Sequence, residues 1–151
     1  MDLTGYREII AFAINNEIEA KQFYAEAAQK VSDSYIKQML MDFSKEEKKH
    51  EKILTGILSR KSIEGYFTET RDYKVAESVD RPKLSIDMKP ADAIALAMKN
   101  EEEAMKLYAD LAEKCSDNEM KNVFLDLAAM ERGHKFKMEQ AFVDIGYPEV
   151  W

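Results

Sequence analysis

The tetrapeptide Glu47-Lys48-Lys49-His50 has a counterpart 84 residues further along the chain, Glu131-Arg132-Gly133-His134. Both have the pattern Glu-x-x-His, and the two histidines of the chain each end one of them. Residues three positions apart lie on the same face of an α-helix, so each glutamate and its histidine can point to one place. If both pairs face a shared interior, the pattern predicts a site for a pair of metal ions.

Four stretches of the sequence have apolar residues at alternating steps of three and four, which is typical of amphipathic helices. Short breaks follow the first and third stretches, so each neighbouring pair is expected to form an antiparallel hairpin. The first hairpin is expected at about residues 4–61 and the second at about 90–144. The expected N-caps are Thr4 for the first helix, Ser32 or Asp33 for the second and Ser116 for the fourth.

Residues 62–89 lack a helical period and are expected to form a crossover between the hairpins. Such a long segment is unusual as a loop in a compact domain, but a connection along the length of a bundle would explain it. Tyr66, Phe67 and Tyr73 are expected to pack on the bundle or at a subunit contact. The sequence therefore predicts an all-α fold, a four-helix bundle that forms a single domain over residues 1–151.

The two hairpins are related by an internal repeat. Residues Ile10–Leu58 align with Ile94–Phe142 without a gap, and 17 of 49 positions are identical. A helical repeat that keeps its alignment over this length indicates two similar hairpins related by a pseudo-twofold axis.

Four glutamates interrupt the apolar stripes at positions where the helical period predicts burial. They are paired by the repeat, Glu17 with Glu101 and Glu47 with Glu131. A buried carboxylate without a partner is unfavourable, and these stripes offer almost no Lys or Arg to pair with it. Two divalent cations would match the four charges. The remaining glutamates of these helices are expected on solvated faces, among them Glu19, Glu26, Glu46, Glu51, Glu102, Glu103 and Glu113.

The composition excludes several classes of function. The formal net charge of −7 argues against binding to nucleic acid or to an anionic membrane. The single cysteine, Cys115, excludes a disulfide framework and a Cys-based zinc or rubredoxin-type site within this sequence. No signal peptide and no apolar run of membrane-spanning length is recognised, so a cytoplasmic protein is expected.

One glutamate on each of two helices plus Glu-x-x-His on each of two others is the ligand pattern of di-iron and di-manganese carboxylate bundles. Tyr24 and Tyr108 follow Glu17 and Glu101 by seven residues. On these residues the chain resembles the ferritin-like superfamily, and within it the rubrerythrin-like branch. The resemblance covers both hairpins and implies a ferritin-like fold.

The resemblance also implies residue roles. Glu47 and Glu131 would bridge two metal ions, Glu17 and His50 would complete the first ion, and Glu101 and His134 the second. Tyr24 and Tyr108 would donate hydrogen bonds to ligand carboxylates, although as aromatic residues they can equally fill the stripes. Iron is the expected metal, and manganese or zinc would also suit the ligands.

By resemblance, we expect a di-iron oxidoreductase that reacts with peroxide or dioxygen, with a role in oxidative stress. An external electron donor such as a separate rubredoxin-type protein is expected, because no Cys-x-x-Cys pair is present, and so is a homodimer. A further departure from rubrerythrins is Ala104, where they carry an additional glutamate. A ferroxidase or iron-storage protein, a metal-stabilised bundle with an interaction role, and a hydroxylase of an organic substrate are alternatives.

Overall fold

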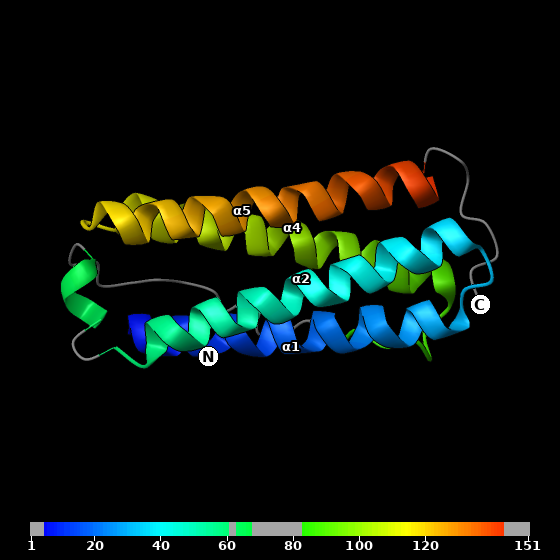
Figure 1. Cartoon of the computed structure of the whole chain (residues 1–151), viewed down its shortest axis with the longest axis horizontal. Helices are drawn as coiled ribbons and strands as arrows, with labels where there is room; N and C mark the ends of the chain where they lie inside the picture. Colours follow the sequence, from blue (N-terminus) through cyan, green and yellow to red (C-terminus); the bar gives the residue numbers. More distant parts are fainter. Residues whose placement is uncertain (1–4, 61–62, 68–82, 144–151) are drawn as a thin grey trace.

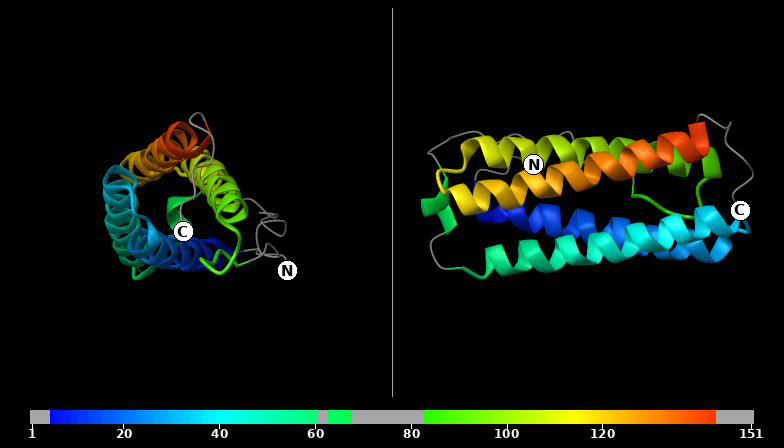
Figure 2. Two further views of the ribbon diagram at one scale, coloured as in Figure 1. Left: turned by 90° about the vertical axis from the view of Figure 1, so that its right-hand side faces the viewer. Right: turned by 45° about the horizontal axis from the view of Figure 1, so that its top comes forward.

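The computed structural model describes residues 5–60, 63–67 and 83–143. Long helices arranged side by side along one axis dominate it, as Figure 1 and Figure 2 show. They are α1 (Tyr6–Lys30), α2 (Ser34–Leu58), α4 (Pro90–Lys114) and α5 (Asn118–Met138). A short 3₁₀ helix, η1 (Ile63–Tyr66), and a π-helical turn, η2 (Glu139–Val143), complete the described elements. α1 packs on α2, and α4 packs on α5. The predicted all-α four-helix bundle is confirmed.

The helix starts reproduce the internal repeat. α1 and α4 begin 84 residues apart, as do α2 and α5. Asp33 caps α2 by accepting a hydrogen bond from the Ile36 amide at 2.9 Å, and Asp117 caps α5 by accepting one from the Met120 amide at the same distance. The expectation that Ser116 caps α5 is wrong, because the Ser116 hydroxyl instead donates to the Tyr66 carbonyl at 3.0 Å. Gly5 is the N-cap of α1, and Thr4 lies outside the described residues.

The second helix of the first hairpin ends slightly before the expected residue 61, while the second hairpin stays helical to Val143. α2 stops at Leu58, where Ser59 donates its hydroxyl to the Gly56 carbonyl at 2.8 Å. Arg7 at the start of α1 donates to the carbonyls of Leu58 and Arg60 at 2.9 and 3.1 Å. These side chains satisfy carbonyl groups that a terminating helix leaves without partners. α5 gives way to η2 at Glu139, so the last turn of the second hairpin is π-helical.

The core is divided into two apolar clusters with a polar layer between them. One cluster includes Ile10 of α1 and Leu54 of α2, and it reaches into the last turns of α4 and the first turns of α5. The other includes the opposite ends of the same helices. The residues between them, called the polar layer below, are Glu17, Glu47, His50, Glu101, Glu131 and His134.

The described parts of the connection between the hairpins lie against the bundle. Phe67 is buried and stacks on Tyr6 with ring centroids 4.1 Å apart, at the end where α1 begins. α4 begins at the other end, since Ala93 belongs to the cluster that contains Ala27. The connection therefore joins opposite ends of the bundle, as a crossover requires. Tyr66 is half-buried, and Tyr73 lies outside the described residues. Among the described helices, none combines the length and apolarity that a membrane crossing requires.

Candidate metal centre

The polar layer lies halfway along the bundle, and all four long helices contribute to it. α1 supplies Glu17 and α4 supplies Glu101, while α2 and α5 each supply a Glu-x-x-His pair. All six side chains are at most 3% exposed. The structure thus brings together the six residues that the sequence predicts as metal ligands.

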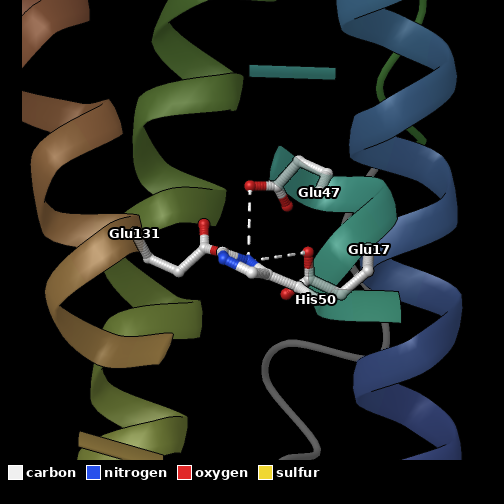
Figure 3. A group of neighbouring side chains, drawn as sticks. All are labelled: Glu17, Glu47, His50 and Glu131. Carbon is white, nitrogen blue, oxygen red and sulfur yellow. Dashed lines mark hydrogen bonds and ion pairs between the residues drawn. The ribbon is translucent and has the colours of Figure 1, made fainter. Parts of the chain in front are cut away.

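One half of the layer is arranged around His50. Its Nδ1 atom lies 2.8 Å from Glu131 Oε1, 3.6 Å from Glu17 Oε2 and 3.8 Å from Glu47 Oε1. In Figure 3 these four side chains point toward one another from α1, α2 and α5. One nitrogen or oxygen atom from each can be chosen so that all lie within 4.8 Å of one another, which is close enough to hold one metal ion.

The other half is arranged in the same way around His134. Its Nδ1 atom lies 2.9 Å from Glu47 Oε1, 3.7 Å from Glu101 Oε1 and 4.0 Å from Glu131 Oε2. Glu47, Glu101, Glu131 and His134 form a second group of candidate ligands within 4.8 Å. Glu47 and Glu131 belong to both groups, so the geometry accommodates two neighbouring ions that share two carboxylates.

Two buried tyrosines join the hairpins at this level. The Tyr24 hydroxyl donates to Glu101 Oε1 at 2.5 Å, and the Tyr108 hydroxyl donates to Glu17 Oε1. Burial, together with the negative carboxylates nearby, raises the pKa of both hydroxyls well above their usual value. Both tyrosines therefore stay protonated and act as donors to a carboxylate of the opposite hairpin.

The charges of the layer are not balanced by protein groups alone. Burial, then repulsion by Glu101 and the other carboxylates, raises the pKa of Glu47 and Glu131 well above the usual value. Burial alone would raise the pKa of Glu17 as well, but hydrogen bonds with Glu47, His50 and Tyr108 lower it. In the metal-free protein the layer thus keeps protons on some carboxyl groups, and a cation can replace those protons.

The donor atoms fit a pair of metal ions. Several buried polar atoms of the layer make no well-aligned hydrogen bond: Glu17 Oε2, Glu47 Oε1, Glu101 Oε2 and His134 Nδ1. Buried polar atoms are rarely left without a partner in folded proteins, and bound ions are one way to satisfy them. Carboxylate oxygen and imidazole nitrogen are ligands for iron, manganese and zinc.

The model of the rubrerythrin family matches residues 8–141, which is most of the chain. The chain belongs to the rubrerythrin family. This agrees with the resemblance inferred from the two Glu-x-x-His motifs and the paired Glu and Tyr positions. A search of curated proteins finds no match.

Two solved structures resemble this member of the rubrerythrin family over most of its length. A hypothetical protein from Pyrococcus furiosus is 28% identical with a TM-score of 0.69, and the match covers 91% of this chain and 87% of that one. A protein from Thermotoga maritima, described as a ferritin-like diiron-carboxylate protein, is 18% identical with a TM-score of 0.69, covering 92% and 94%. The fold is therefore ferritin-like.

One residue at the site was not predicted. Glu46 was expected on a solvated face, but it is half-buried and contacts Nε2 of His134. This contact, more than any other effect, lowers the pKa of Glu46. Burial opposes a charge on His134, yet hydrogen bonds with Glu101, Glu46 and Glu47 raise its pKa to about 12. The available signal was its position: Glu46 lies three residues after Phe43 and four before His50, on the edge of the α2 stripe.

A small cavity adjoins the carboxylates between α1 and α4. Its volume is about 20 Å³, which is room for about one water molecule. Repeat-related pairs line it, Asn16 with Asn100 and Ala20 with Ala104, together with Leu84 from the crossover. Ala104 and Glu101 both line it, and the small side chain of Ala104 leaves space beside the Glu101 carboxylate.

Proposed function

We propose that this rubrerythrin-family protein holds two iron ions in its polar layer and reduces peroxide or dioxygen. The observation that carries the proposal is the pair of buried four-residue groups that share Glu47 and Glu131. Glu17 and His50 complete the position of one ion, and Glu101 and His134 the other. When bound as Fe(II), the two ions supply one electron each to the oxidant.

The chain's own residues give this site its stability and order. Tyr24 and Tyr108 orient Glu101 and Glu17 by donating hydrogen bonds to them. The apolar clusters on both sides exclude water, which strengthens the attraction between the carboxylates and a cation. Glu47 and Glu131 must release protons to become ligands, so metal binding is coupled to proton release.

The size of the adjoining cavity supports a small oxidant. At about 20 Å³ it has space for a molecule of roughly the size of water beside the carboxylates. An organic substrate would need a larger pocket at this position, as small-molecule sites generally measure several hundred Å³. Peroxide or dioxygen is therefore favoured over the hydroxylation of an organic substrate. By family likeness, the role is protection from oxidative stress in the cytoplasm, with electrons from an external protein donor.

A homodimer is part of this proposal, and the outer face of α5 supports it. Leu125 and Phe136 are exposed there, by 45% and 58%. Phe136 borders a hollow of about 440 Å³ that also includes Arg132 and Glu139. A second copy in the antiparallel orientation would bring Arg132 of one copy toward Glu139 of the other, beside the Lys135–Glu139 ion pair of 3.3 Å within each copy.

The test begins with anaerobic protein loaded with Fe(II) and its metal content measured. About two ions per chain are expected, and mixing with peroxide or dioxygen in a stopped-flow spectrometer should oxidise them within seconds. Sedimentation of the same sample distinguishes a dimer from a cage. Oxidation of many ions per chain in a large assembly would instead indicate iron storage. Fe(II) protein that is inert to both oxidants would contradict the proposed reaction and leave a structural role for the metal.

A further inference from the structure

The two halves of the polar layer have the same ligands but different neighbours. The repeat pairs every candidate ligand with an identical residue, and it pairs Tyr24 with Tyr108. Two positions that contact the site on one side are not identical. Phe43 of α2 corresponds to Leu127 of α5, and Glu46 corresponds to Met130.

Both unmatched residues of α2 contact the same imidazole across the bundle. Glu46 contacts Nε2 of His134, while the Phe43 ring stacks on His134 with centroids 4.3 Å apart and an angle of 30°. His134 is therefore fixed at its outer nitrogen and along its face. Its inner nitrogen, Nδ1, is buried and faces the carboxylates of Glu47, Glu101 and Glu131.

The imidazole of His50 lacks this support. Its polar contacts within the described residues all lie at Nδ1, which pairs with Glu131 at 2.8 Å. In the described part of the chain, no carboxylate contacts its Nε2 atom. The residue in the matching position, Met130, is 39% exposed, and a thioether sulfur is only a weak acceptor. Leu127 has no ring that could stack on the imidazole.

We propose that Glu46 is a positioning residue for His134, and that it makes the metal position of His134 tighter than that of His50. The inference rests on the proposed two-metal function. Once metal binding has displaced the proton on Nδ1, an imidazole that donates Nε2–H to a carboxylate presents its Nδ1 lone pair to the metal. Partners of this kind raise ligand basicity and change metal affinity by roughly 10–100-fold. The two ions therefore bind in order, at His134 first and at His50 second.

The test uses the fact that the chain has only two histidines, so ¹⁵N-histidine NMR gives two spin systems. Metal-free protein is titrated with Zn²⁺, and the signals are assigned with His50→Gln and His134→Gln variants. In the wild type, the His134 signals should change during the first equivalent and the His50 signals during the second. The binding constants of the two steps should differ by roughly 10–100-fold.

Two variants test the cause of this order. Glu46→Gln should weaken the first step alone, so that both histidines respond together. Met130→Glu places a carboxylate in the matching position and should strengthen the second step. Circular dichroism checks that each variant is folded, since neither residue is fully buried.

Each outcome separates the inference from the function on which it rests. Simultaneous filling in the wild type, filling of His50 first, or an order unchanged in Glu46→Gln would overturn the inference and leave the two-metal site standing. A wild-type protein that takes up neither Zn²⁺ nor Fe(II) would remove the proposed function itself.

Discussion

The two hairpins contribute the same kinds of side chain to the polar layer, but they hold them in different surroundings. Nδ1 of His50 and Nδ1 of His134 each lie within 3 Å of the shared carboxylate on the opposite hairpin, at 2.8 and 2.9 Å. Among the described residues, His134 alone has a carboxylate at its other nitrogen and a phenyl ring on its face. The comparison indicates that the positions of ligand atoms are strongly constrained, while the residues behind them can differ between the halves.

The largest effects are expected from the carboxylates, because two are shared and two are not. Glu47→Ala or Glu131→Ala removes a ligand from both groups, so each variant should lose both ions after dialysis. Glu17→Ala or Glu101→Ala removes a ligand from one group and should leave about one ion per chain. Metal analysis of the four variants measures this, with Glu113→Ala, an exposed position on α4, as the control. Equal metal content in Glu47→Ala and Glu17→Ala would contradict the shared role.

The stability of the metal-free protein should depend strongly on pH. The pKa values of Glu47 and Glu131 are raised in the folded state. Their contribution to the free energy of unfolding is therefore fully present below about pH 4.5 and is lost as the pH rises through the raised values. His134, with its pKa raised to about 12, contributes fully below about pH 6.5 and loses this contribution toward pH 12. The pKa of Glu17 is lowered, so its stabilising contribution is present above about pH 4.5 and is lost as the pH falls below that value.

We therefore expect the melting temperature of the metal-free protein to decrease as the pH is raised from 5 to 9. Bound metal needs deprotonated carboxylates, so the stabilisation by added Fe(II) or Zn²⁺ should grow over the same range. Glu47→Gln and Glu131→Gln should each flatten the dependence of the metal-free melting temperature on pH. The two effects should be similar, because the pKa values of both carboxyl groups are raised for the same reasons. Thermal unfolding followed by circular dichroism measures the profiles. A metal-free protein that becomes more stable toward pH 9 would contradict the assignment of protons within the layer.

Much of this arrangement follows from periodicity along single helices. Glu17 and Glu101 interrupt apolar stripes, and burial at those positions depends only on the helix to which each belongs. The repeat then predicts that equivalent residues meet at one level, because equivalent hairpins place equivalent positions at the same height. Sequence alone therefore indicates the fold and the group of six residues that converge.

Contacts between helices are harder to predict from the periodicity of single helices. Glu46 lies on the edge of the α2 stripe, and whether it faces solvent or His134 depends on how closely α5 approaches. The cap of α5 was assigned to Ser116 instead of Asp117, because the two residues are adjacent and both residue types cap helices well. Which of the two caps the helix depends on Tyr66, a residue distant in sequence, whose carbonyl accepts a hydrogen bond from the Ser116 hydroxyl.

The smallest effects are expected from the tyrosines, which test whether the halves are equal away from the histidines. Tyr24→Phe and Tyr108→Phe each remove one donor from a buried carboxylate, Glu101 or Glu17. Hydrogen bonds to charged groups are worth about 2 kcal/mol, so each variant should lose about that much stability without metal. Urea unfolding measures both, and Tyr35→Phe, at a residue that is 73% exposed, should have no effect.

The two losses should be equal, because each tyrosine crosses to the opposite hairpin and both are fully buried. Tyr24 also has neighbours of its own, Phe43 at 5.4 Å between ring centroids and the Met138 sulfur at 3.9 Å from its hydroxyl. Removing the hydroxyl should cost little at these two contacts, because the ring contact does not need it and sulfur is a weak acceptor. A loss in Tyr24→Phe that clearly exceeds the loss in Tyr108→Phe would extend the asymmetry from His134 to the whole half of the layer around it.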